Sequence, residues 1–253
     1  MTEDASLLLD FDGICWWCRS RSADTGEHKY KQSDLTDLMG DDELLYWGQD
    51  GGSHLRPIRG KSGITRDRYG VVKFPRSLCG DCNNRRSQPL DHSYQLYSTY
   101  VRTQPETANR DGVDFWAIYG SNWRQRVLDL ARYHAKHFGC RLVRDRVPVP
   151  PSLRAFLDGA DDMLDAHMAL VTASDVAETF GQGLRMSPAL VYANPAFTRL
   201  DAVVLATYIG ALGVRYEWRS AGMPDRDQFF HHPEPVINRF ESEQDALLAR
   251  VAP

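Results

Sequence analysis

The sequence lacks any apolar stretch close to the roughly 18 residues that a membrane-spanning helix needs. Its first residues, Met1-Thr2-Glu3-Asp4, contain neither the basic nor the apolar part of a secretory signal peptide. It has only five cysteines, too few for a disulfide-rich scaffold, and four of them have metal-binding spacing. We therefore expect a protein of the reducing cytoplasm that does not associate with membranes.

The chain also lacks an excess of positive charge, since its formal net charge is −4. Bulk charge therefore does not mark a nucleic-acid-binding protein. No internal repeat or low-complexity tract is visible in the second half of the chain. With 253 residues, 42% of them hydrophobic, the chain is long enough for one large or two small globular domains with a real core.

What the sequence does contain is two Cys-x-x-Cys pairs, Cys15-Trp16-Trp17-Cys18 and Cys79-Gly80-Asp81-Cys82. Two residues between thiolates let one tight turn direct both sulfurs at the same ion, and two such turns complete a tetrahedral site. We predict a structural zinc ion held by Cys15, Cys18, Cys79 and Cys82, with four free thiols as the alternative. The fifth cysteine, Cys140, falls in a helical pattern and is expected to be a buried small hydrophobic residue.

The dipeptide Glu27-His28 lies between the two pairs, and Asn83-Asn84 follows the second pair directly. This arrangement resembles the HNH endonucleases, in the zinc-stapled branch with Cys-x-x-Cys, Glu-His and Cys-x-x-Cys-Asn-Asn. The resemblance covers roughly residues 12–100. It implies a ββα-metal finger, in which one strand carries the histidine and the helix after the second strand carries the last metal ligand.

Carried over residue by residue, the resemblance implies that His28 is the general base that activates a water molecule. It also implies that Glu27 and Asn83 are ligands of a catalytic magnesium or manganese ion. These residue types suit the chemistry, because imidazole accepts protons near neutral pH and hard oxygen ligands suit these ions. With only two protein ligands, coordination positions stay open for phosphate and water.

Two features depart from the family pattern. Fifty residues, from Lys29 to Leu78, separate the Glu-His pair from the second cysteine pair, so a long insertion is expected there. The middle asparagine of the motif, which orients the base, is replaced by the segment Lys73-Phe74-Pro75-Arg76. We expect Asn84 or a backbone carbonyl to orient His28 in its place.

Basic residues concentrate in and after the insertion. Nine Lys or Arg residues lie between Arg56 and Arg86, against the two acids Asp67 and Asp81. Such a local positive field suits contact with phosphates, whereas the alternative is a solvated insertion whose charge only keeps it soluble. The residues predicted to contact nucleic acid are Arg66, Arg68, Lys73, Arg76, Arg85 and Arg86.

The expected fold class is α+β, with a zinc-stapled, HNH-like domain over residues 1–102 and an α+β accessory domain over residues 103–253. Apolar spacing predicts a helix over 123–140 that Gly139 closes, and a short helix over 151–157. The later segments 168–171, 189–192, 202–212 and 214–218 are expected to be strands of a mainly antiparallel sheet, or strands with one buried helix. His134 and His137 share a helix face without a third ligand, so we interpret them as a satisfied pair rather than a metal site.

The sequence therefore predicts a metal-dependent endonuclease that cuts phosphodiester bonds in DNA, with RNA not excluded as substrate. Three alternatives stay open. In the first, the finger is catalytically silent and only binds nucleic acid, which the missing middle asparagine would explain. In the second, the chain is the nuclease subunit of a multi-component antiphage defence or mobile-element system, in which a partner protein chooses the target. In the third, the whole chain is a purely structural zinc protein.

Overall fold

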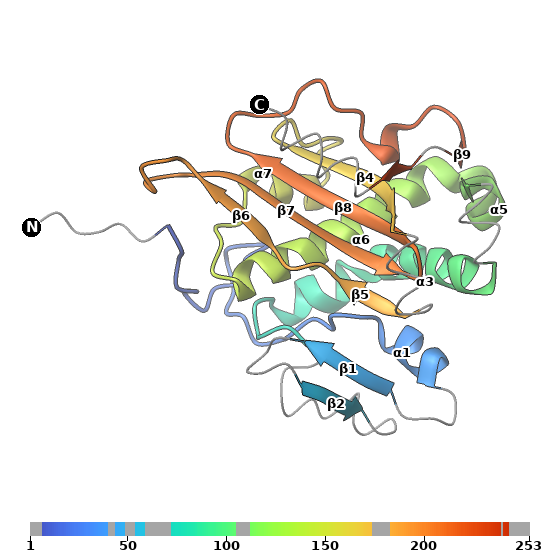
Figure 1. Ribbon diagram of the computed structural model, residues 1–253, viewed down its shortest axis with the longest axis horizontal. Coiled ribbons are helices and arrows are strands. Elements are labelled where there is room, and N and C mark those ends of the chain that lie inside the picture. Colours follow the sequence, from blue (N-terminus) through green and yellow to red (C-terminus); the bar gives the residue numbers. More distant parts are fainter. Residues whose placement is uncertain are drawn as a thin grey trace, which may run out of the picture.

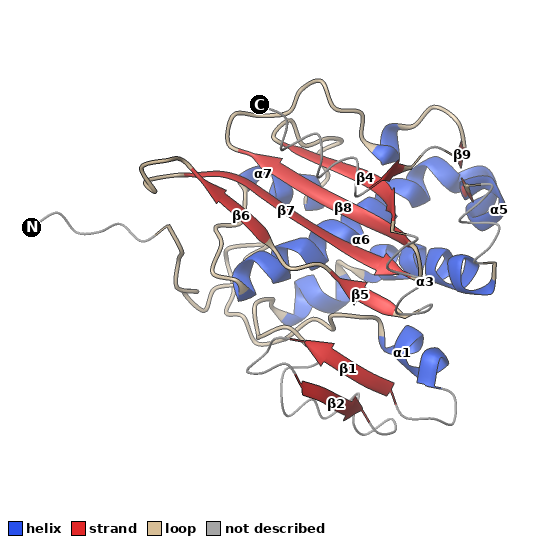
Figure 2. Cartoon of the chain, in the orientation of Figure 1, coloured by secondary structure: helices blue, strands red, loops and turns tan. Residues whose placement is uncertain are grey.

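The computed structural model describes residues 7–39, 44–48, 54–58, 72–104, 112–173, 183–238 and 240–242. It combines one large sheet with helices packed behind it, and a separate small hairpin (Figures 1 and 2). The described helices are α1 (Gln32–Met39), the π-helix η1 (Asp81–Arg85), α3 (Gln88–Thr103), α5 (Phe115–Tyr119), the 3₁₀-helix η2 (Gly120–Asn122), α6 (Trp123–Arg144), α7 (Pro151–Leu157) and the 3₁₀-helix η3 (Phe229–His231). Among these helices, none has the length and apolar character needed to cross a membrane.

The described strands form three sheets. The large sheet has the order β10-β4-β8-β7-β5, and β6 also pairs with β7, while β1 pairs with β2 and β3 pairs with β9. The strands are β1 (Leu44–Gly48), β2 (His54–Ile58), β3 (Val113–Asp114), β4 (Ala166–Thr172), β5 (Leu184–Met186), β6 (Leu190–Ala193), β7 (Leu200–Ile209), β8 (Leu212–Arg219), β9 (Val236–Ile237) and β10 (Glu241–Ser242).

The large sheet confirms the predicted mainly antiparallel architecture. All of its pairings are antiparallel except that of β10 with β4. The segments over 202–212 and 214–218 form the hairpin β7–β8, so none of the four apolar segments is a helix. Gly210 turns this hairpin with a φ of 59°, a backbone conformation that glycine adopts without steric cost.

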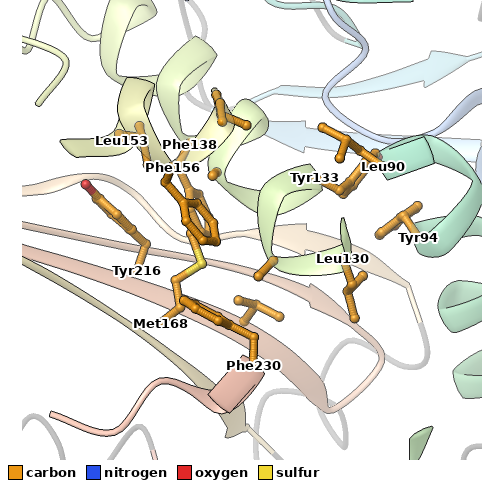
Figure 3. Packing of buried hydrophobic residues seen from close by; sticks show 14 of the residues in the cluster. Leu90, Tyr94, Leu130, Tyr133, Phe138, Leu153, Phe156, Met168, Tyr216 and Phe230 are labelled. Carbon is orange, nitrogen blue, oxygen red and sulfur yellow. The ribbon is translucent and has the colours of Figure 1, made fainter. Parts of the chain in front are cut away.

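Helix α6 runs through the middle of the molecule. Every residue from 133 to 142 is buried, so this part of the helix contacts protein on all sides. The ring of Phe138 lies 5.2 Å from that of Tyr216 on β8, and Leu130, Phe156 and Met168 extend the same apolar layer between helix and sheet (Figure 3). On another side, α6 packs against α3, where the rings of Tyr133 and Tyr94 stack with centroids 3.9 Å apart.

The prediction that Gly139 closes this helix is wrong, because α6 continues to Arg144. Gly139 has a packing role instead. A Cβ atom at this position would lie 2.2 Å from the indole ring of Trp16. The missing side chain therefore lets the tryptophan beside the first cysteine lie directly on the helix backbone.

A single hydrophobic cluster includes side chains from both sides of residue 102. Trp16, Phe74 and Leu78 from the first half belong to the same cluster as Phe138 of α6 and Tyr216 of the sheet. The cysteine-containing segments are therefore built onto the common core. Helical structure after Cys79 comes in two pieces, η1 and α3, with Pro89 in the first turn of α3.

Replacing Gly139 by alanine is expected to lower the free energy of unfolding by about 1–3 kcal/mol, because the added methyl group overlaps the Trp16 ring. The gain in helix propensity offsets only about 1 kcal/mol. Gly183→Ala is the matched control, since nothing lies within 4 Å of a Cβ atom there. Thermal unfolding of both variants checks this, and equal melting temperatures would contradict the packing argument.

Candidate metal centre and the Glu27–His28 segment

The two Cys-x-x-Cys turns come together in the structure. The sulfur atoms of Cys15, Cys18, Cys79 and Cys82 all lie within 4.8 Å of one another, and those of Cys18 and Cys79 are 3.9 Å apart. Sulfurs bound about 2.3 Å from a tetrahedral zinc ion lie about 3.8 Å from each other, so the cluster has the dimensions of such a site. A disulfide needs about 2.05 Å between sulfurs, and all four cysteines are free. The cluster can hold a structural metal ion such as zinc.

Local structure explains how the turns direct their sulfurs. The carbonyl of Cys15 accepts the N–H of Arg19, which closes the first turn, and Arg19 has a positive φ of 53°. The carbonyl of Cys79 accepts the N–H of Asn83, so the second pair begins a helical segment. The thiol of Cys82 hydrogen-bonds to Cys15 and lowers the pKa of Cys15, which favours the thiolate that binds zinc.

Arg86 supports the cysteine cluster from outside. Its guanidinium donates to the sulfur of Cys82 at 3.5 Å and lies 4.4 Å above the ring of Trp17. Asp158 receives hydrogen bonds from Arg86 at 2.5 Å and from the Trp17 indole at 2.8 Å. Arg86, which the sequence predicts to contact nucleic acid, is thus bound to the turn after α7.

Glu27 and His28 lie on an extended segment that is antiparallel to residues 72–78. Bridges pair Thr25 with Leu78 and His28 with Lys73. The carbonyl of Glu27 accepts the N–H of Phe74 at 2.8 Å. The chain then passes through Cys79 into η1. Two antiparallel extended segments are therefore followed by a helical segment.

The carboxylate of Glu27 points at helix α6. One oxygen lies 3.0 Å from the ammonium of Lys136, and the other lies 3.6 Å from Nε2 of His137. Burial opposes ionisation of Glu27, but the charge of Lys136 and the hydrogen bond from His137 outweigh it and hold the pKa of Glu27 well below its usual range. Lys136 is fully buried and also lies 3.2 Å from Asp91 on α3.

The two asparagines after Cys82 differ in their surroundings. Asn83 lies on η1, and its side-chain oxygen is buried without a hydrogen-bond partner among the described residues. Asn84 is exposed, and its amide donates to the carbonyl of Gly80 at 2.9 Å. Phe74, in the segment that replaces the middle asparagine, is buried with its ring 6.2 Å from that of His137. That Asn84 orients His28 stays a prediction.

The predicted nucleic-acid residues do not share one environment. Arg66 and Arg68 lie outside the described residues. Arg76 is exposed and Lys73 half-buried, whereas Arg85 pairs with Asp81 at 2.5 Å and Arg86 with Asp158. These pairs reduce the positive charge that η1 presents to solvent.

Sequence reasoning missed Lys136 as a partner of Glu27, and it missed Asp91 as the second carboxylate beside that lysine. It did single out His134 and His137, and both are buried among aromatic rings. Burial lowers the pKa of His134 to about 3, so this imidazole is neutral. Within the described part of the chain, the four cysteines form the only grouping of at least three His, Cys, Asp or Glu residues with metal-binding geometry.

Comparison of the chain with protein-family models, with curated proteins and with solved structures finds no match.

Replacing Cys79 by serine is expected to abolish zinc binding and to lower the melting temperature by about 10 °C or more, because the ion holds two distant turns together. Metal analysis of the purified protein and thermal unfolding provide the measurements. Cys140→Ala is the control, since Cys140 is buried outside the cluster and its replacement should leave zinc content unchanged. A zinc-free parent protein with an undiminished melting temperature would refute the site.

Proposed function

We propose that this protein is a metal-dependent endonuclease of the HNH type that hydrolyses phosphodiester bonds in DNA. The main support is the arrangement of the segment that carries His28, the antiparallel segment before Cys79, and the helical segment that carries Asn83. The cysteine cluster lies where the last two of these segments join. This order matches the motif order of the family that the sequence resembles.

His28 is the proposed general base. It is half-buried on the extended segment, and its backbone is fixed because Glu27 and Lys29 on either side are hydrogen-bonded to Phe74 and Val72. A fixed imidazole can accept a proton from a water molecule that attacks a phosphate. Proton acceptance by a positioned side chain contributes typically about 10²–10⁴-fold to a rate.

The proposed magnesium or manganese ion would neutralise the charge that develops on the phosphate. Asn83 fits a role in holding it, because its buried side-chain oxygen has no hydrogen-bond partner among the described residues. Glu27 does not fit an open ion site, since both of its oxygens already face Lys136 and His137. The role of Glu27 as an ion ligand therefore stays a prediction from the sequence, and its ion pair with Lys136 argues against that role.

A nucleic-acid-binding module without catalysis is the second candidate. The observation that favours it is the buried Phe74 in the segment where the family has its middle asparagine. Both candidates use phosphate contacts from the basic segment before the second cysteine pair. RNA as substrate, a cytoplasmic location and a partner protein in a defence or mobile-element system stay predictions from the sequence.

The variant His28→Ala is expected to lose metal-dependent cleavage of plasmid DNA by at least about 100-fold, because the attacking water loses its proton acceptor. Zinc content, melting temperature and DNA affinity should stay at the parental values. His92→Ala, an exposed histidine on α3, serves as the matched control and should cleave normally. If the parent protein binds DNA but does not cleave it with any divalent ion, the binding-module candidate replaces the nuclease.

Replacing Arg66, Arg68 and Arg76 by alanine is expected to weaken DNA binding at all sequences. The slope of log K against log salt should become shallower by about 0.9 for each phosphate that the variant no longer neutralises. Fluorescence anisotropy over a salt series measures both effects. The single variants Arg76→Ala and Arg226→Ala provide a matched pair of exposed arginines, and equal binding by both would remove Arg76 from the interface.

A further inference from the structure

A buried lysine connects the two halves of the proposed site. Lys136 on α6 has no exposed surface, and its ammonium lies 3.0 Å from Glu27 and 3.2 Å from Asp91. Burial disfavours the ammonium, but the two carboxylates raise the pKa of Lys136, so it stays charged. Removing one carboxylate leaves the other as the single counter-charge of this buried ammonium.

The first connection leads to His28. Glu27 precedes His28 on an extended segment, where successive side chains point to opposite sides. An anchor that holds the Glu27 carboxylate on α6 therefore directs the His28 ring away from that helix. The other oxygen of Glu27 faces His137, so the anchor has two contacts on α6.

The second connection leads to Asn83. Asp91 uses one oxygen for Lys136 and the other, at 2.8 Å, for the hydroxyl of Ser87. The same hydroxyl lies 2.8 Å from the backbone carbonyl of Asn83. A chain of polar contacts thus runs from the Glu27 carboxylate through the ammonium of Lys136 to the turn that carries Asn83.

We infer that Lys136 is a positioning residue that sets the separation between the His28 segment and the Asn83 turn, and that Glu27 is its anchor and not an ion ligand. This inference rests on the proposed function. It assigns the carboxylate of the Glu-His dipeptide to the buried interior of the protein. Asn83 and the substrate then supply the oxygen ligands of the proposed ion.

The titratable groups around Glu27 come from three segments. Lys136 and His137 come from α6, and Asp91 comes from α3. Lys31, which lies just before α1, donates to the backbone carbonyl of Asp91. A small cation close to the Glu27 carboxylate would meet the positive charge of Lys136, which is buried and cannot move into solvent.

The test compares Lys136→Met and Glu27→Gln with the parent, and Arg126→Met on the same helix is the matched control. Displacing reacting groups by about 1 Å costs on the order of 100-fold, so both variants should lose about that factor in kcat. The manganese concentration for half-maximal cleavage and the manganese affinity of the free protein, followed by electron paramagnetic resonance, should change less than about twofold. The double variant should lose no more kcat than the more impaired of the two single variants, because the two residues act as one unit.

The result that overturns the inference is a Glu27→Gln protein whose manganese affinity falls tenfold and whose cleavage returns at high manganese, since that behaviour marks an ion ligand. If Lys136→Met does not fold, Glu27→Gln alone decides between the two outcomes. If the parent cleaves nothing, the proposed function fails, and NMR of the folded proteins still tests the positioning. The side-chain signals of His28 and Asn83 should shift in Lys136→Met but not in Arg126→Met, and unchanged signals overturn the inference.

Discussion

The structure around the candidate site depends on one electrostatic constraint, which is the burial of a positively charged side chain of helix α6. An ammonium without exposed surface needs carboxylates close by, and Lys136 finds them on the Glu27 segment and on α3. Two stretches of chain that lie far apart in sequence are therefore fixed against the same helix. The Trp16 ring on Gly139 adds an apolar contact on the same helix, so charge and packing act together.

Much of the architecture follows from local patterns that the sequence displays directly. The cysteine cluster follows from the Cys-x-x-Cys spacing, because two residues between thiolates let one tight turn direct both sulfurs at the same point. The strands β4, β7 and β8 follow from short apolar runs bounded by turn residues, and α6 follows from its apolar period. The apolar period of the helix does not show that Gly139 lies inside it, because the place of this glycine depends on the Trp16 ring from the first half of the chain.

The candidate site was predictable only in part, for physical reasons. Lys136 falls between the apolar positions of its helix, and the ordinary expectation for such a lysine is a solvated surface position. Its burial depends on a carboxylate that no local pattern connects with it. Arg86 looks like a phosphate contact in the sequence, yet Asp158, 72 residues further along the chain, binds it. Ion pairs between distant residues are decided by the tertiary fold, and sequence spacing does not record them.

The shared core has a consequence for the order in which the chain acquires its structure during synthesis. Residues of the cysteine-containing half leave the ribosome before α6 exists, and at that stage Trp16 has no helix to cover it and Glu27 has no cation. Zinc can join the two cysteine turns at that time, but the extended segment that carries His28 acquires its lasting position only when α6 docks. Synthesis thus makes the four cysteines available before the helix that anchors the segment with the proposed reactive groups.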